Sequence, residues 1–172
     1  MFEEIDFKTL EFNPFSTLAD EGFLITAGDK NKFNTMTATW GFFGNMWSKP
    51  TYAIVVRPTR YTYQFLEKHN QFSVSFFPLK YYATLQFLGS NSGRDFDKLA
   101  KTELNPIFLE GEDNKEFITY KEANMVICCT KVSRVPLTSD HFLTKEIEEH
   151  YPQKDYHTLY MGFIDKIVVQ DF

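Results

Sequence analysis

The chain is most constrained by nine residues, 33–41, with the sequence FNTMTATWG. Their side chains alternate with the period of a β-strand, which sets two threonines against three other residues: Thr35 and Thr37 on one side, Asn34, Met36 and Ala38 on the other. Hydroxyls and small side chains stand where a buried strand would carry Val or Ile, so the backbone is open to close approach. Trp40 adds a large flat surface after the strand, and Gly41 adds a flexible joint. Taken alone, this pattern favours a half-exposed edge strand.

The remaining patterns predict a mainly β chain, a β-barrel with added helices. Alternating or continuous apolar runs indicate about seven strands, at 23–27, 33–40, 52–56, 72–76, 106–109 with 116–119, 124–132 and 159–169. The run 52–56 is apolar on both faces and predicts a buried strand. Gly162 predicts a bulge in the last strand. Residues 1–21 are expected to form an arm packed on the domain, and residues 44–50 a loop.

Four helices are expected, at 60–69, 78–88, 92–100 and 138–150. The residues expected to cap, open or stop them are Thr59, Pro78, Gly89 and Ser92. The fourth helix would lie on the surface, with Phe142 and Ile147 on its buried side.

Length, charge and cysteine usage narrow the class of protein. The 172 residues are most simply one domain, residues 1–172, long enough to bury a good core. A net charge of -5 argues against general binding to nucleic acid or to an anionic membrane. No apolar run approaches the roughly 20 residues that span a bilayer, and the acidic N-terminus lacks a signal pattern, so we expect a cytoplasmic protein. Cys128 and Cys129 are neighbours in a strand and point to opposite faces, which predicts two buried thiols rather than a disulfide or a metal pair.

The strongest local signal for chemistry is the segment 57–62, RPTRYT. A strand end runs here into a helix start, whose unpaired N–H groups and partial positive charge attract anions. Arg57 and Arg60 add paired donors that match phosphate oxygens. From spacing alone, two interpretations have equal weight. The segment binds a phosphate, or its two arginines lie on the surface and Thr59 only caps the helix.

Weaker cationic candidates follow at Lys80 and in the segment 92–98, SGRDFDK. Ser92 and Gly93 give a second open helix start, and Lys98 lies one turn beyond Arg94. Taken alone, this segment favours surface pairing among its charged residues over an anion site.

Catalytic and metal-binding motifs are absent from the sequence. It contains no G-x-S-x-G elbow, no Walker loop and no G-x-G-x-x-G fingerprint. The histidines lack ligand spacing, and all four are expected to be solvated: His69, His141, His150 and His157. Carboxylate pairs such as Glu148 and Glu149 belong to a charged helix face. We therefore expect no catalytic side chain and no metal site, and an enzyme of this kind would leave the hard chemistry to a cofactor.

Four segments resemble, in order and spacing, the flavin reductase-like proteins of the FMN-binding split-barrel class. They are NTMTATWG at 34–41, RPTRYT at 57–62, SVSFF at 73–77 and SGRDFDK at 92–98. The similarity extends from Phe12 to Val169. It implies a split β-barrel homodimer that binds FMN near the subunit interface.

The resemblance also implies roles for the matching residues. The flavin ring would contact the strand at Thr35, Met36, Thr37 and Ala38, beside Trp40. The phosphate end would contact the helix start at Arg57, Arg60, Tyr61 and Thr62, with further cofactor contacts from Ser92, Gly93 and Lys98. In this family a hydride passes from NADH or NADPH to the flavin and electrons pass on to an acceptor, with no protein acid or base strictly required.

Three functions are consistent with the resemblance. The first is an NAD(P)H-dependent flavin oxidoreductase. The second is a non-enzymatic electron carrier of the flavoredoxin kind, which holds FMN tightly and exchanges electrons with a redox protein partner. The third is a split-barrel module that sequesters flavin or haem without turnover. A protein that retains no flavin would exclude the first two.

Overall fold

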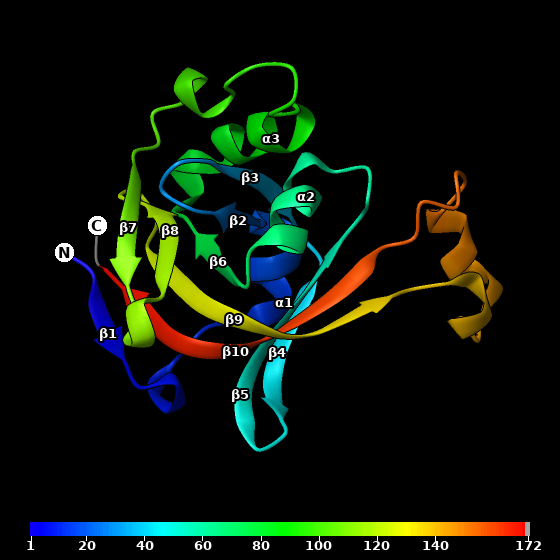
Figure 1. Cartoon of the computed structure of the whole chain (residues 1–172), viewed down its shortest axis with the longest axis horizontal. Coiled ribbons are helices and arrows are strands. Elements are labelled where there is room, and N and C mark those ends of the chain that lie inside the picture. The colour runs from blue at the N-terminus through cyan, green and yellow to red at the C-terminus, as the bar shows by residue number, and fades with distance from the viewer. Residues whose placement is uncertain (171–172) are drawn as a thin grey trace.

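Ten strands are the main regular elements of the computed structural model, which describes residues 1–170 (Figure 1). Their bounds are β1 Glu3–Ile5, β2 Phe23–Gly28, β3 Phe33–Ala38, β4 Gly41–Met46, β5 Lys49–Val56, β6 Gln71–Phe76, β7 Pro106–Glu110, β8 Glu116–Tyr120, β9 Met125–Pro136 and β10 Thr158–Val169. The main sheet is antiparallel and follows the order β3-β2-β6-β9-β10-β5-β4, with β1 paired to the C-terminal end of β10. The hairpin β7–β8 stands apart from it. Residues 171–172 of the predicted domain lie outside the described residues.

Helices are few and short. The two longest are α2 (Tyr61–Lys68) and α3 (Tyr82–Ser90); the others are α1 Pro14–Ser16, a π-turn at Thr17–Glu21, and 3₁₀ turns at Phe7–Thr9, Leu79–Tyr81, Leu99–Lys101, Glu112–Asn114, Ser139–His141 and Lys145–His150. Within residues 1–170 no helix is long and apolar enough to cross a membrane. The prediction of a mainly β chain with added helices is confirmed.

The sheet curls into an open barrel. Strands β3 and β4 stand at opposite ends of the strand order, yet only Thr39 and Trp40 separate them in sequence, so the two ends of the sheet come together. The barrel interior is filled by large side chains that are almost completely buried, among them Phe23, Tyr52, Phe72 and Tyr160. Strand β2 is buried on both faces, which explains its continuous apolar run.

A second core lies outside the barrel. It packs α3 and the β7–β8 hairpin against the outer face of the sheet through Leu24, Leu88, Phe117 and Tyr120. Both α2 and α3 contact β3, so the two helices approach the same edge strand. This arrangement places the end of α3 beside the start of α2.

Several elements differ from the sequence-based expectation. The predicted loop 44–50 is wrong, because β4 and β5 form a tight hairpin there; Trp47 and Ser48 make its turn with φ of 52° and 59°. Nothing in residues 41–46 alternates cleanly, so β4 carried little sequence signal. Residues 1–21 contain β1 as well as short helical turns. The bulge at Gly162 is confirmed by a register shift between Met161 and Gly162.

Two of the four predicted helices, at 92–100 and 138–150, are wrong. Residues 92–100 form turns rather than a helix that begins at Ser92. Residues 138–150 form two 3₁₀ turns, in which Ile147 is 38% exposed rather than buried. Strand β3 ends at Ala38, before Trp40, and Cys128 and Cys129 are buried free thiols as predicted.

Candidate functional site

Strand β3 is an edge strand, and its residues line more than one cavity. An edge strand leaves one row of backbone N–H and C=O groups outside the ladder, where a ligand can reach them. The first cavity, here the edge cavity, has a volume of about 250 Å³ and is lined by Met36, Thr37, Ala38, Thr39, Trp40, Val55, Arg57, Arg60 and His157. The predicted edge position is confirmed, but the strand is not half-exposed, because Asn34, Thr35 and Met36 are buried and its other residues are partly buried.

The second cavity, here the basic cavity, has a volume of about 140 Å³. It lies where the start of α2 faces the end of α3, and it is lined by Asn34, Met36, Thr59, Arg60, Tyr61, Thr62, Gly89, Ser90, Asn91, Ser92, Gly93, Arg94 and Lys98. Met36 and Arg60 line both cavities, so the two form one continuous site along β3.

Two cations of the basic cavity are held by the C-terminal end of α3. Arg60 Nη2 donates to the Gly89 carbonyl at 3.0 Å, and Lys98 Nζ donates to the carbonyls of Leu88 and Asn91 at 2.6 and 3.0 Å. Carbonyls at a helix C-terminus carry partial negative charge and favour cations. Lys98 is only 4% exposed, so the surface pairing expected for segment 92–98 is wrong for this lysine.

Arg60 and Lys98 are partly or fully buried, and no carboxylate in the described lining balances their charge. Burial first, and the charge of Arg60 second, lower the pKa of Lys98 to about 8. Burial first, and Arg57 second, also lower the pKa of the Arg60 guanidinium. Among the described lining residues of the basic cavity there is no carboxylate. A cavity with three cations and no acid, in a chain of net charge -5, suits an anion.

The start of α2 adds backbone donors to the same cavity. Arg60 occupies the N-cap position, so the first N–H groups of α2, at Tyr61 and Thr62, precede any intrahelical partner. Thr59 forms no cap hydrogen bond, and the prediction that it caps the helix is wrong. Its carbonyl instead accepts from Arg94 Nη1 at 2.9 Å.

The floor of the basic cavity depends on a glycine. A Cβ added to Gly93 would lie 2.2 Å from Oδ1 of Asn34, so any side chain there would force the Asn34 amide to move. Asn34 in turn donates from Nδ2 to Thr62 Oγ1 at 2.8 Å, and Thr62 is completely buried. Gly93 and Thr62 therefore shape the cavity, while the Ser92 hydroxyl accepts from the backbone of Arg94.

The threonines of β3 use their hydroxyls within the protein. Thr35 Oγ1 donates to the Ile25 carbonyl at 3.2 Å, and Thr37 Oγ1 donates to the Leu85 carbonyl on α3. Thr37 lines the edge cavity, whereas Thr35 is absent from the described lining of both cavities. Lys80 also lies away from both, with its ammonium 5.2 Å from the ring of Tyr81.

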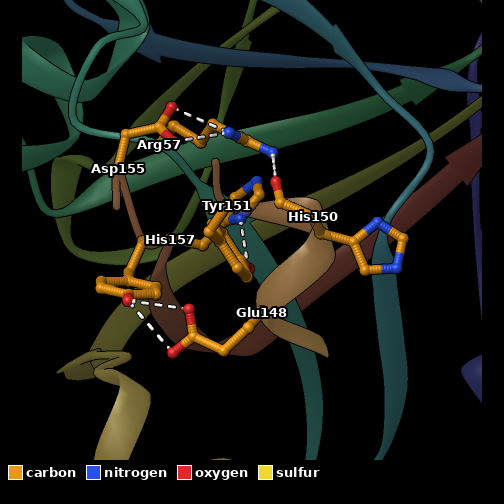
Figure 2. A network of polar contacts seen from close by, with 7 residues as sticks. Arg57, Glu148, His150, Tyr151, Asp155 and His157 are labelled. Atoms are coloured by element: carbon orange, nitrogen blue, oxygen red, sulfur yellow. Dashed lines mark hydrogen bonds and ion pairs between the residues drawn. The ribbon is translucent and has the colours of Figure 1, made fainter. Parts of the chain in front are cut away.

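Two lining residues of the edge cavity, here its far wall, are Arg57 after β5 and His157 at the end of the segment 137–157 between β9 and β10. Figure 2 shows the polar contacts that join Arg57 to this segment. Arg57 Nη1 donates to both carboxylate oxygens of Asp155 at 2.8 Å, and its Nη2 donates to the His150 carbonyl at 2.8 Å. The hydrogen bond from Arg57 lowers the pKa of Asp155. This ion pair ties the segment to the end of β5, so part of the Arg57 guanidinium already has a partner.

His157 lies inside this wall, and the expectation that all four histidines are solvated is wrong for it. Its Nδ1 is 2.8 Å from the Tyr151 hydroxyl, and its ring centre is 5.1 Å from that of Trp40. Burial first, and the charge of Arg57 second, lower the pKa of His157 to about 4, so the imidazole is neutral near pH 7. Sequence reasoning missed this residue. The only signal was its place directly before β10, whose Thr158 pairs with Val56 beside Arg57.

The chain is similar to a known protein family. The family model described as "Flavin reductase like domain" matches residues 15–170. No curated protein sequence matches the chain.

Three solved structures are similar in fold. The FMN-binding domain of a flavin reductases-like enzyme from Shewanella baltica is 15% identical, with 98% of this chain and 77% of that chain covered, at a TM-score of 0.69. Flavoredoxin of Desulfovibrio vulgaris is 22% identical, with 87% and 69% covered, at 0.66. A putative flavin reductase with a split barrel domain from Shewanella frigidimarina is 16% identical, with 88% and 67% covered, at 0.67. The predicted split-barrel fold is confirmed.

Proposed function

Because the chain belongs to the flavin reductase-like family, we propose that it binds FMN and acts as an NAD(P)H-dependent flavin oxidoreductase. The observation that carries the proposal is the pair Arg60 and Lys98. Arg60 is half-buried and Lys98 is buried, and backbone carbonyls hold both cations near the start of α2 and beside the open edge of β3. The described lining of the basic cavity contains no carboxylate that would balance their charge. A phosphate dianion would supply the missing charge, and a flat ring attached to it would extend along β3.

The residues present fit FMN. Its phosphate would receive hydrogen bonds from Arg60, Lys98 and the first N–H groups of α2. Its ring would lie in the edge cavity against the strand at Met36, Thr37 and Ala38, with Trp40 at the end. Thr62, Ser92 and Gly93 would shape the phosphate end rather than supply charge. Arg57 would act mainly through the wall that it fastens to Asp155.

Bound FMN would accept a hydride from a reduced nicotinamide and pass electrons to an acceptor. The chain would bind and orient both partners. Trp40 and His157 also line the edge cavity, where their rings would limit access of water to the flavin. The neutral His157 can donate or accept one hydrogen bond there, which suits the carboxamide of a nicotinamide.

A second candidate is an electron carrier without turnover. The fold similarity to flavoredoxin of Desulfovibrio vulgaris favours it, since a carrier needs the same FMN site and a protein partner instead of a nicotinamide. Trp40 is 44% exposed at the mouth of the edge cavity, where such a partner would dock.

We propose further that the chain is one domain and forms a homodimer in the cytoplasm. Large apolar side chains on the β4–β5 hairpin support the dimer: Phe42 is 57% exposed and Trp47 is 55% exposed. Two buried free thiols fit a reducing compartment. Sedimentation at micromolar concentration tests the dimer, and a monomer that still binds FMN tightly would contradict it.

The function is tested by adding FMN to the purified protein, desalting, and recording the absorbance spectrum. We expect a yellow protein whose flavin bleaches rapidly on anaerobic mixing with NADH or NADPH. Retained flavin that is reduced only by a protein donor would support the carrier instead. A protein that retains no flavin at low salt would overturn both.

A further inference from the structure

A third cavity, here the outer cavity, adjoins the basic cavity. It has a volume of about 710 Å³, within the roughly 300–1,000 Å³ of small-molecule sites, and residues of the β2–β3 turn and of the segment 93–106 line it. No described residue lines both the outer and the edge cavity. The residues that line both the outer and the basic cavity are Asn34, Tyr61, Gly93, Arg94 and Lys98. FMN in the basic and edge cavities would therefore leave the outer cavity open beside its phosphate.

The charge of the outer cavity suits a single negative charge. Lys98 also lines the basic cavity, where the FMN phosphate would draw on it. Among the other described lining residues Lys32 and Arg94 are cations and Asp97 is a carboxylate, which leaves one net positive charge. A phosphate monoester carries up to two negative charges, whereas a carboxylate carries one. The remaining charge therefore favours a carboxylate over a second phosphate.

The backbone around the two cavities supports the same distinction. Helix N-termini are the usual backbone sites for phosphate, and the start of α2 lies at the basic cavity, which Thr62 lines. Thr62 is not among the described lining residues of the outer cavity. The segment 93–106 contributes only the three-residue 3₁₀ turn Leu99–Lys101, which is too short to act as a helix N-terminus.

Arg94 is held where its guanidinium can bind a carboxylate. Its Nη1 donates to the Thr59 carbonyl at 2.9 Å, and its guanidinium carbon lies 5.3 Å from the centre of the Tyr61 ring. The contact to Thr59 uses one of five N–H donors. The edge formed by Nε and Nη2 has the planar spacing that matches the two oxygens of a carboxylate.

The rest of the outer cavity is largely apolar. Phe33 and Phe96 contribute rings, and Leu99, Leu104 and Pro106 contribute aliphatic surface. Phe96 is 39% exposed, so part of its ring is accessible to a ligand. Flat aromatic molecules pack well against such rings, by stacked or edge-to-face contacts. The lining therefore fits a ligand with a flat aromatic body and one carboxylate.

We propose that the outer cavity binds an aromatic monocarboxylate and that this ligand opposes the binding of FMN. Its carboxylate would bind Arg94 beside Lys32, and its ring would pack against Phe33 and Phe96. The site itself is independent of the proposed function, whereas its effect on FMN rests on that function. Both ligands would draw on Arg94 and Lys98, and their like charges would lie in adjoining cavities. Each ligand would therefore weaken the other by the same factor, and an aromatic acid would lower the fraction of the chain that holds flavin.

The site is tested by isothermal titration calorimetry of the flavin-free protein with 2-naphthoate, two fused aromatic rings that carry one carboxylate. Affinity should fall at least about tenfold for the neutral 2-naphthamide, because the charge-assisted bond to Arg94 is lost. Equal affinities for the two compounds, or no binding of 2-naphthoate at millimolar concentration, would overturn the proposal.

Two matched pairs of variants locate the ligand. Ala100→Trp fills the outer cavity, since Ala100 lines it and is exposed, and should weaken 2-naphthoate at least about tenfold with FMN affinity within about twofold. Lys101→Trp places the same ring outside the described lining and should change neither affinity. Lys32→Ala should weaken 2-naphthoate by about threefold to tenfold, whereas Lys30→Ala, which removes a lysine paired with Glu116 in the same turn, should not. Wild-type affinity for 2-naphthoate in both Ala100→Trp and Lys32→Ala would place the ligand elsewhere and overturn the proposal.

The effect on flavin is measured by fluorescence titration of FMN and riboflavin, with and without saturating 2-naphthoate. FMN affinity should fall at least about fivefold, and riboflavin affinity should stay within about twofold because riboflavin lacks the phosphate. An equal loss for riboflavin would place 2-naphthoate at the ring in the edge cavity and overturn the proposal. A steady FMN affinity would overturn the opposition between the two ligands. Absence of FMN binding without 2-naphthoate would overturn the proposed function and leave the calorimetric test of the site standing.

Discussion

The two walls of the edge cavity are built in different ways. The near wall consists of β3 and of Arg60 at the start of α2, and each of these regular elements has its own local sequence pattern. The far wall consists of Arg57 and of His157, which comes from an irregular segment between β9 and β10 that is held by side-chain contacts such as Arg57 with Asp155 across 98 positions of sequence. The near wall carries Arg60, and the far wall carries a neutral histidine beside Arg57, which is paired with Asp155. We therefore expect substitutions in the near wall to change flavin affinity, and substitutions in the far wall to change the reaction of the flavin with its electron donor.

The largest effect is expected at the near wall, from Arg60→Ala. The guanidinium at the N-cap of α2 would bond the phosphate, and a hydrogen bond to a charged group contributes roughly 1.5–3 kcal/mol. FMN binding should therefore weaken by roughly tenfold to a hundredfold, while riboflavin, which lacks the phosphate, should bind both proteins alike. Fluorescence titration of both flavins measures this.

The salt dependence of flavin affinity is a second test of the contact between Arg60 and the phosphate. Added salt should weaken FMN more than riboflavin in wild type, and less so in Arg60→Ala. Equal losses of the two flavins in the variant would show that Arg60 supports the ring or the fold, and the phosphate contact would then be reassigned to Lys98.

A smaller, pH-dependent effect is expected from Lys98. Its pKa is about 8 in the flavin-free protein because burial, and then Arg60, disfavour its charge. A bound dianion favours that charge and raises the pKa, so above about pH 8 binding must take up a proton. FMN affinity should be steady between pH 7 and 8 and then fall by up to about tenfold per pH unit.

Two controls accompany this titration. Riboflavin corrects for ionisation of the ring, and Lys98→Gln should remove the dependence on pH. A steady FMN affinity from pH 7 to 9.5 in wild type, or the same slope in Lys98→Gln, would contradict the role of Lys98.

The contrast between the walls also explains what sequence could predict. Residues 33–38 show a strand period and residues 57–62 show a strand-to-helix junction, each within a few neighbouring residues, so the near wall followed from local patterns. Lys98 was misplaced because its partners are carbonyls of α3, which no spacing of charges reveals. His157 was missed because its environment comes from Arg57, Trp40 and Tyr151, brought together only by the pairing of β5 with β10.

Substitutions in the far wall should have small effects, confined to the reaction with the nicotinamide. Tyr151→Phe removes the hydroxyl that pairs with His157 Nδ1 and frees the imidazole to turn. A hydrogen bond contributes about 0.5–1.5 kcal/mol, so the NADH KM should rise by about twofold to tenfold with FMN affinity unchanged. Tyr156→Phe is the matched control, because its hydroxyl binds Glu148 in the same segment and not His157. A change in FMN affinity in Tyr151→Phe would show that the far wall also holds the cofactor.

The smallest effect is expected at Thr59, where local pattern and structure disagree. Its place before α2 is typical of a helix cap, but its side chain forms no cap hydrogen bond and Arg60 occupies the N-cap position. Thr59→Ala should therefore change the free energy of unfolding by less than about 0.5 kcal/mol, as at other surface positions. Asn13→Ala is the matched positive control, since Asn13 does cap the next helical turn by accepting from the Phe15 N–H at 3.0 Å, and a lost cap costs about 1 kcal/mol. Urea unfolding of both variants measures the difference. A cost at Thr59 equal to that at Asn13 would restore the cap that the sequence suggested, and with it a start of α2 one residue earlier.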